Sequence, residues 1–191
     1  MDAMEVLRKR HSARALRDPA PTGAALEAIL ESATRAPDHG RLRPWRFILI
    51  ESQQRISLGN LLAERLRRTR PSATDEMLER ERQKAFRAPL IIVVAARCNL
   101  AAKVPVIEQI LSAGAAAQNM MLAAFAQGFN AMWKTGDAAY DDDVKQALGL
   151  EPKDAIVGFI HLGTEDGEPW SLARSSWRDF TRVWNQSASR E

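Results

Sequence analysis

The chain has 191 residues, of which 46% are apolar and 27% charged, and its formal net charge is +3. This balance is typical of a globular domain and argues against a disordered chain or a membrane protein. No apolar run is long enough to span a bilayer and no Pro-, Gly- or Ser-rich linker divides the sequence, so we expect one domain over residues 1–191.

Cysteine and histidine usage limits the chemistry further. Cys98 is the only cysteine, which rules out an internal disulfide and a cysteine-clustered metal site, and we expect it to be a buried thiol at a strand end. His11, His39 and His161 are far apart and none is paired at a metal-ligand spacing, so no metal site is expected. The N-terminal segment lacks the apolar core of a secretory signal, which favours a cytoplasmic location.

The predicted elements begin with a helix capped by Asp2, with Met4 and Leu7 on its buried side. The remaining predictions follow from hydrophobic spacing and from Gly and Pro stops. They are a helix over 22–35, an irregular loop over 36–44, a strand over 45–51, helices over 53–68 and 75–86, a strand over 90–96, a helix from Pro105 to Gly128, a strand over 129–133, a helix over 141–148 and a strand over 155–163.

Two of these segments indicate the core. The run LIIVVAA at 90–96 is continuously apolar and rich in β-branched residues, which favours a central strand covered on both faces. The segment 112–128 is nearly all small or apolar, so as a helix it must be buried, either in the core of one chain or against a second copy. Four strands with helices between them predict a helix–sheet–helix sandwich.

Other features are structural or open in their meaning. Asp141, Asp142 and Asp143 are typical of a helix cap and first turn. The tail carries several aromatic residues and should dock on a surface; these are Trp170, Trp177, Phe180 and Trp184. The basic cluster at 8–11, with Arg14, is either a solvated helix end or a phosphate clamp. No G-x-S-x-G elbow and no G-x-G-x-x-G occurs.

Five segments, in order along the chain, resemble the nitroreductase family of flavin enzymes, and most of all its short bacterial NAD(P)H nitroreductases. They are RHSAR at 10–14, RAPDH at 35–39 leading into PWRF at 44–47, AGAAAQNMMLAAFAQGF at 113–129, WKTG at 133–136 and IVGFIHLGT at 156–164. The resemblance implies an α+β, three-layer helix–sheet–helix sandwich with a mixed central sheet. It also implies a homodimer that binds each FMN at the interface with residues of both chains.

The resemblance also implies roles for particular residues. In the family's pattern, Arg10, His11 and Ser12 fall where FMN phosphate and ribityl groups bind, and guanidinium and hydroxyl donors suit a dianionic phosphate. Arg14 falls near N1 and the C2 oxygen of the flavin. Arg35 and His39 match positions that reach FMN from the partner subunit. The segment beside the flavin is Trp133, Lys134 and Thr135. A segment assigned to NAD(P) in relatives matches Ala123, Ala124, Phe125, Ala126, Gln127 and Gly128.

The implied activity is ping-pong hydride transfer from NADH or NADPH through FMN to a nitroaromatic, quinone or similar small electrophilic acceptor. No catalytic side chain is required, because the flavin carries the hydride. Alternatives are dehalogenation or chemistry on the flavin itself, on the same fold, and, from another class, a basic nucleic-acid-binding module. Arg174 or Arg178 could complete the phosphate site. The charged segment 65–87, which shapes the substrate opening in relatives, leaves the acceptor open.

Overall fold

A computed structural model describes residues 1–168 and 175–184 of the chain. Its elements are α1 (Ala3–Lys9), β1 (Leu16–Arg17), α2 (Gly23–Ala33), η1 (His39–Arg41), β2 (Trp45–Glu51), α3 (Gln53–Thr69), α4 (Asp75–Gln83), η2 (Lys84–Phe86), β3 (Leu90–Ala96), α5 (Val106–Ala126), β4 (Asn130–Lys134), η3 (Asp137–Tyr140), α6 (Asp142–Ala147), β5 (Ala155–Glu165) and η4 (Trp177–Phe180).

The strands form one five-stranded sheet with β3 and β5 at its centre. β2 pairs with β3, β3 with β5, and both β4 and β1 with β5; within the described residues every one of these pairings is antiparallel. The parallel part of the predicted mixed sheet is confined, in those residues, to a single bridge between Ser12 and Ala131. β1 was not predicted, because two residues carry no periodicity.

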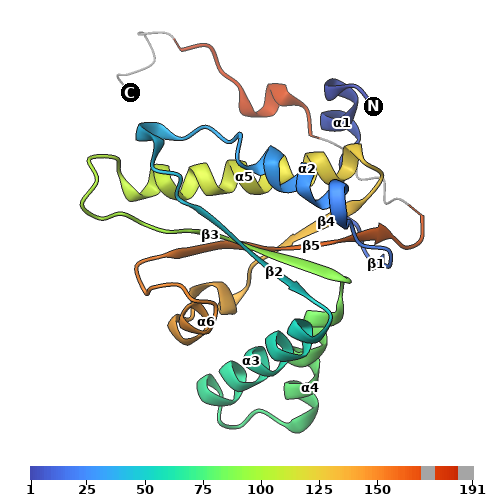
Figure 1. Cartoon of the computed structure of the whole chain (residues 1–191), viewed down its shortest axis with the longest axis vertical. Helices are drawn as coiled ribbons and strands as arrows, with labels where there is room; N and C mark the ends of the chain where they lie inside the picture. Colours follow the sequence, from blue (N-terminus) through green and yellow to red (C-terminus); the bar gives the residue numbers. More distant parts are fainter. Residues whose placement is uncertain (169–174, 185–191) are drawn as a thin grey trace.

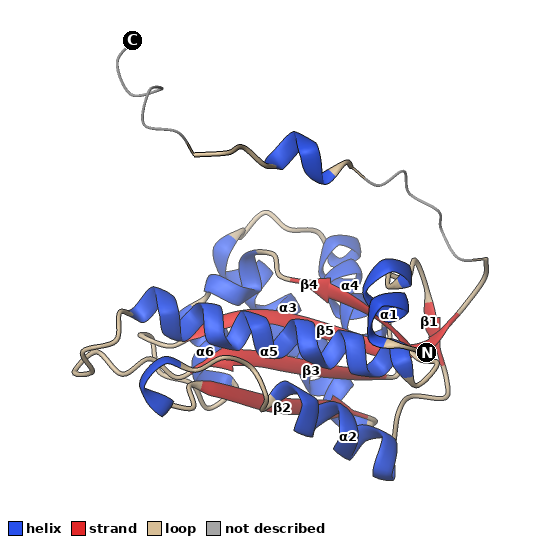
Figure 2. Ribbon diagram, turned by 90° about the horizontal axis from the view of Figure 1, so that it is seen from above, coloured by secondary structure: helices blue, strands red, loops and turns tan. Residues whose placement is uncertain are grey.

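Helices cover both faces of the sheet, as Figures 1 and 2 show: α1, α2 and α5 on one face, α3, α4 and α6 on the other. All residues of β3 are buried. Alternate residues of β3 enter different cores, since side chains of a strand point to opposite faces. Ile92 and Val94 pack in the core beneath α2 and α5, whereas Ile91 and Val93 pack in the core beneath α3 and α6. The three-layer sandwich is therefore confirmed.

α5 is a core helix, as its composition predicted. It begins directly after Pro105 and ends before Gly128, which takes the left-handed φ of 86° that favours glycine. Ala113, Ala116 and Ala117 are fully buried within the same chain. α5 is also the longest helix among the described residues, and no helix there combines the length and apolar character needed to cross a membrane.

The prediction for the face of α1 is wrong. Asp2 caps the helix as expected, accepting a hydrogen bond from the Glu5 amide at 2.9 Å. However, Met4 and Leu7 are 54% and 50% exposed, and Val6 is the residue of α1 that is buried. An apolar residue on a short helix need not face its own core, so the apolar side of α1 lies uncovered by the described chain.

The aromatic tail does not dock on its own chain in the described residues. The exposed fractions of its side chains are 64%, 78% and 78% for Trp177, Phe180 and Trp184. Arg178 lies over the Trp177 ring, 4.6 Å from the ring centroid. Trp170 and Arg174 lie outside the described residues.

Candidate functional site

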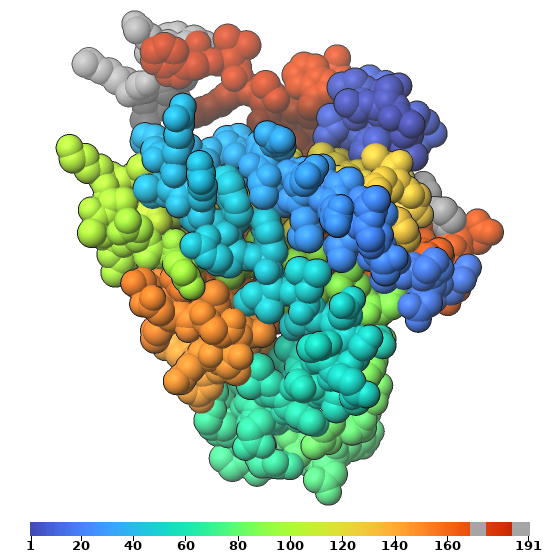
Figure 3. Space-filling model, viewed as in Figure 1, coloured from blue at the N-terminus to red at the C-terminus, as the bar shows by residue number. Residues whose placement is uncertain are grey.

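A cavity of about 290 Å³ lies where β4 ends, between the sheet and α3. Its walls combine apolar side chains from the sheet and α3 with charged ones from α3, α4 and the neighbouring turns. The apolar lining residues are Leu58, Leu62, Leu66, Ile91, Ala138 and Phe159. The polar lining residues are Arg65, Glu81, Lys84, Arg87, Lys134, Thr135, Asp137 and His161, and Gly136 completes the lining. In the space-filling view (Figure 3), α3 and α4 form the lower end of the molecule, beside the orange segment that contains α6.

The turn after β4 delivers two predicted cofactor residues to this cavity. Because side chains alternate along a strand, Trp133 and Lys134 face opposite sides of the sheet. Trp133 packs in the core beneath α5, where its indole N–H donates to the Val157 carbonyl at 3.1 Å, while Lys134 and Thr135 line the cavity. A side chain at Gly158 would collide with Trp133, since its Cβ would lie 2.2 Å from the indole nitrogen.

The charged groups of the cavity do not balance. Lys84 pairs with Glu81, and the Arg65 guanidinium lies 3.2 Å from the Asp137 carboxylate. Arg87 and Lys134 form no ion pair with a described residue, whereas both acidic residues of the lining are paired. The cavity therefore has a positive surplus, which favours an electron-rich or anionic occupant.

His161 adds a neutral polar group to the same wall. Burial lowers its pKa, and the charges of Arg87 and Lys134 lower the pKa further, although hydrogen bonds to the Phe159 and Lys84 carbonyls oppose the change. Its Nδ1 lies 3.3 Å from the Phe159 oxygen and its Nε2 lies 3.4 Å from the Lys84 oxygen. The lowered pKa favours the neutral form of this imidazole in the wall of a positively charged cavity.

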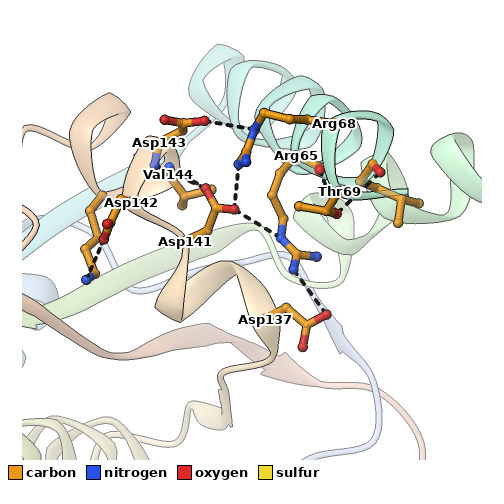
Figure 4. Close-up of polar contacts among 10 residues, drawn as sticks. Arg65, Arg68, Thr69, Asp137, Asp141, Asp142, Asp143 and Val144 are labelled. Atoms are coloured by element: carbon orange, nitrogen blue, oxygen red, sulfur yellow. Dashed lines mark hydrogen bonds and ion pairs between the residues drawn. The ribbon is translucent and has the colours of Figure 1, made fainter. Parts of the chain in front are cut away.

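An ion-pair network joins α3 to the far side of the cavity turn (Figure 4). Asp141 lies 2.6 Å from Arg68 and 3.6 Å from the Arg65 Nε, and Arg68 also pairs with Asp143 at 2.8 Å. Asp141 caps α6 by accepting from the Asp143 and Val144 amides, which confirms the capping role predicted for this acidic run. Burial would raise the Asp141 pKa, but its hydrogen bonds from Arg68 and Val144 lower it overall.

The predicted phosphate-binding segment runs along the edge of the same strand. Ser12 bridges to Ala131, and the Ala13 amide donates to the Ala131 carbonyl at 3.2 Å. Lys134 is three positions along the strand from Ala131, a distance of about 10 Å at the usual rise per residue. The structure therefore brings Ser12 and the cavity turn to one strand. Ser12 and Arg14 are exposed and Arg10 is partly buried.

His11 differs from its neighbours, because its ring points into a hydrogen-bonded cluster. Its Nε2 lies 2.9 Å from both oxygens of Glu165 and 3.0 Å from the Asn130 amide nitrogen. Its Nδ1 lies 3.2 Å from the Lys9 carbonyl, and its ring meets Phe125 edge-on with centroids 5.8 Å apart. Nothing in the sequence pattern predicted this arrangement.

The other predicted residues lie on the opposite face of the sheet, with α2 and α5. The His39 side chain is 68% exposed and its Nδ1 lies 2.6 Å from the Glu108 carboxylate. Arg35 lines a separate hollow between α1, α2 and α5, together with Asn119. Within one chain, neither Arg35 nor His39 is among the residues that line the cavity.

The segment at 123–128, which the family resemblance links to NAD(P), forms the C-terminal end of α5 and the residues just after it, on this same face. Ala124 is fully buried, and the Gln127 side-chain amide donates to the carbonyls of Ala123 at 3.2 Å and Ala25 at 3.4 Å. Ala123 and Ala126 line the hollow beside Arg35. The NAD(P) role of this segment stays a prediction.

Sequence reasoning named none of six further polar residues of the cavity as site residues: Glu81, Lys84, Arg87, His161, Arg65 and Asp137. The first three belong to a charged helix and its end, where a solvated face is the usual meaning. His161 is a lone histidine in an apolar strand. The charge density of 65–87 was the available signal, but only the folded chain brings it beside the turn at 134–136.

Known proteins resemble this chain over most of its length. The model of the Nitroreductase family matches residues 7–164. The "Putative NAD(P)H nitroreductase YdjA" of Escherichia coli (strain K12) is 43% identical over 164 residues, which is 86% of this chain and 88% of that protein.

Solved structures agree in fold. The crystal structure of a nitroreductase-like family protein from Bacillus cereus has a TM-score of 0.80 at 26% identity and covers 96% of each chain. The structure described as a putative nitroreductase in complex with FMN from Desulfovibrio desulfuricans has a TM-score of 0.73 at 23% identity, covering 97% of this chain and 98% of that one.

Proposed function

Since the chain belongs to the nitroreductase family and is an oxidoreductase of that family, we propose that it passes electrons from NAD(P)H through bound FMN to a small electrophilic acceptor. One observation carries the proposal: the turn at 134–136 closes a cavity that has an apolar floor and surplus positive charge. The FMN-bound relative supports the same cofactor.

The residues present suit a flavin ring. Ile91, Phe159 and the leucines of α3 offer apolar surface, while Lys134 and Arg87 place unpaired positive charge at its edge. Positive charge beside a flavin stabilises the negative charge that the ring gains on reduction. When bound, FMN supplies the two-electron carrier, and the protein supplies binding, orientation and charge.

The segment from Arg10 to Arg14 suits the phosphate end of the same cofactor. It lies along β4, whose other end lines the cavity, so one elongated ligand can meet both. Guanidinium and hydroxyl groups are strong donors to a phosphate dianion. This placement also favours a small anionic ligand over the nucleic-acid partner that the N-terminal arginines suggested.

We further propose a homodimer, because Arg35 and His39 could reach a flavin only from a second copy. They lie on the face of α2 and α5, away from the cavity of their own chain. Uncovered apolar side chains support such a contact, since large exposed apolar surfaces mark interaction sites. They are Met4, Leu7, Ile107, Leu111, Trp177, Phe180 and Trp184. A cytoplasmic location stays a prediction.

The reaction balances without a protein acid or base. A nitroaromatic, NAD(P)H and one proton give the nitroso compound, NAD(P)+ and water; a quinone gives the hydroquinone and NAD(P)+. We propose that reductant and acceptor use the cavity in turn, in a ping-pong sequence. Glu81 and Asp137 are both paired, so no free carboxylate among the described lining residues repels the partly negative oxygens of a nitro or quinone acceptor.

An absorbance experiment tests the proposal. The protein, purified and reconstituted with FMN, should be yellow, should bleach with NADH or NADPH under nitrogen, and should regain its colour on addition of an acceptor. A panel of nitroaromatic, quinone and halogenated aromatic acceptors then separates the alternatives on this fold. A folded protein that retains no FMN at micromolar concentration would overturn the proposal.

A further inference from the structure

The cluster of His11, Asn130 and Glu165, here called the His11 cluster, joins three distant parts of the chain. His11 follows α1, Asn130 begins β4 and Glu165 ends β5. The side chains of His11 and Glu165 are 20% and 19% exposed, and Asn130 is 4% exposed. A mostly buried carboxylate requires hydrogen-bond donors, so the cluster is a specific arrangement and not a solvated contact.

Hydrogen-bond roles in the cluster follow from the acceptors. The His11 Nε2 faces both Glu165 oxygens at 2.9 Å, so it carries a proton and donates. The Asn130 Nδ2 donates to the Glu165 Oε2 at 2.9 Å. Its 3.0 Å approach to the His11 Nε2 therefore brings two donors together around one carboxylate.

The cluster continues into the strand edge that carries the proposed phosphate segment. The Asn130 Oδ1 accepts from the Ala131 amide at 2.7 Å, and the Ala131 carbonyl accepts from the Ala13 amide at 3.2 Å. At the other end, the His11 Nδ1 lies beside the carbonyl of Lys9, the last residue of α1. The bond from Nε2 to Glu165 thus ties the residue between Arg10 and Ser12 to the end of β5.

We propose that His11 is a positioning residue and not an FMN ligand: its bond to Glu165 holds Arg10 and Ser12 where they meet the phosphate. This inference rests on the proposed function. Neighbouring side chains in extended backbone point to opposite sides, so an inward His11 turns its two neighbours outward. Without the imidazole, Glu165 loses a charge-assisted partner and the segment loses its anchor to β5.

Comparing FMN with riboflavin, which lacks the phosphate, tests the inference. The dissociation constants of both flavins are measured for the full chain and for His11→Leu by fluorescence quenching. We expect His11→Leu to weaken FMN binding about tenfold while riboflavin changes less than about threefold, because only phosphate contacts are displaced. Arg10→Ala should show the same pattern.

Asp154→Leu is the matched control. Asp154 is 2% exposed and accepts from the Cys98 and Glu151 amides, away from the proposed phosphate segment. It should lower the thermal midpoint as His11→Leu does, yet leave the ratio of FMN to riboflavin affinity unchanged. A folded His11→Leu variant with an unchanged ratio, or an equal loss for both flavins, would overturn the inference.

Two conservative variants separate positioning from direct contact and serve if His11→Leu does not fold. His11→Gln keeps one donor for Glu165 and should restore part of the ratio. Glu165→Gln removes negative charge near the segment: if His11 contacts the phosphate directly, FMN affinity rises or holds, whereas a positioning role predicts that the ratio falls. If the unsubstituted protein binds neither flavin, the proposed function itself fails.

Discussion

The two faces of the sheet are built for different tasks. Beneath α2 and α5 the core is continuous and apolar, and α5 brings fully buried alanines such as Ala113 and Ala117 to it. Beneath α3, α4 and α6 the covering helices are rich in charge, and a cavity remains. β3 supplies residues to both cores. One strand can thus join an alanine-lined core to a layer that leaves room for a ligand.

The two layers differ because their helices approach the sheet to different extents. Small residues on α5 let this helix lie close to the sheet. On the other face, α4 contributes Leu78 as its buried residue, and its charged side chains pair along the helix. α3 and α4 meet each other closely at Gly59, beside the backbone of Arg82.

Ala117→Glu should have the largest effect, because it buries a carboxylate in the closely packed layer. Ala117 is 0% exposed, and an unpaired buried charge should cost more than about 4 kcal/mol of unfolding free energy. Urea unfolding or, if the variant does not fold, the yield of soluble protein measures it. The control is Gly114→Ala on the same helix, where an added Cβ meets nothing within 4 Å and helix propensity should add about 1 kcal/mol. A destabilised Gly114→Ala would show that a second chain covers this side of α5.

Gly59→Ala should have an intermediate effect on the other face. The added Cβ would lie 2.9 Å from the Arg82 carbonyl oxygen, a backbone atom that cannot rotate away. We expect a net loss of about 1–2 kcal/mol, because the strain exceeds the helix-propensity gain of about 1 kcal/mol. FMN retention should fall with it if α3 and α4 shape the cavity. A variant as stable as the original protein would mean that the two helices separate freely.

pH should produce the smallest effect. Burial lowers the His161 pKa below its usual 6.5, so the unfolded chain binds this proton more readily than the folded one. The contribution of His161 to the free energy of unfolding is therefore fully present above pH 6.5. It declines as the pH falls from 6.5 toward the lowered pKa of the folded state. His161→Phe should flatten the dependence of the thermal midpoint on pH, by less than about 4 °C between pH 7.5 and 5.5. An unchanged slope would assign the pH dependence to other groups.

The sequence was most informative where one local rule decides the structure. A continuous apolar run after Pro89, with four β-branched residues at its centre, predicted the strand Leu90–Ala96, and Trp45–Glu51 follows Pro44 in the same way. The face of α1 was mistaken because amphipathic spacing shows which residues share a side but not what covers that side. Met4 and Leu7 share a side that the described chain leaves open.

The site could be predicted only in part for a related reason. Lys134 and Thr135 end a recognisable strand, so their family motif located them, and the structure brings them to a cavity. Arg87 and His161 carry no motif and meet them only through tertiary packing. The His11 cluster joins residues from three elements, and no spacing rule connects a histidine after one helix with a glutamate at the far end of a strand.

The pairing of β2 with β3 has a consequence for how such a protein can diversify. Glu51 and Leu90 are partners across the ladder. The segment between them, residues 52–89, contains α3 and α4 and therefore begins and ends at neighbouring points of the sheet. This segment supplies Arg65, Lys84 and Arg87 to the cavity, whereas Lys134 and Thr135 lie at the end of β4 in the sheet. Substitutions in this segment can therefore reshape one wall of the cavity while the sheet and the turn at 134–136 keep their places.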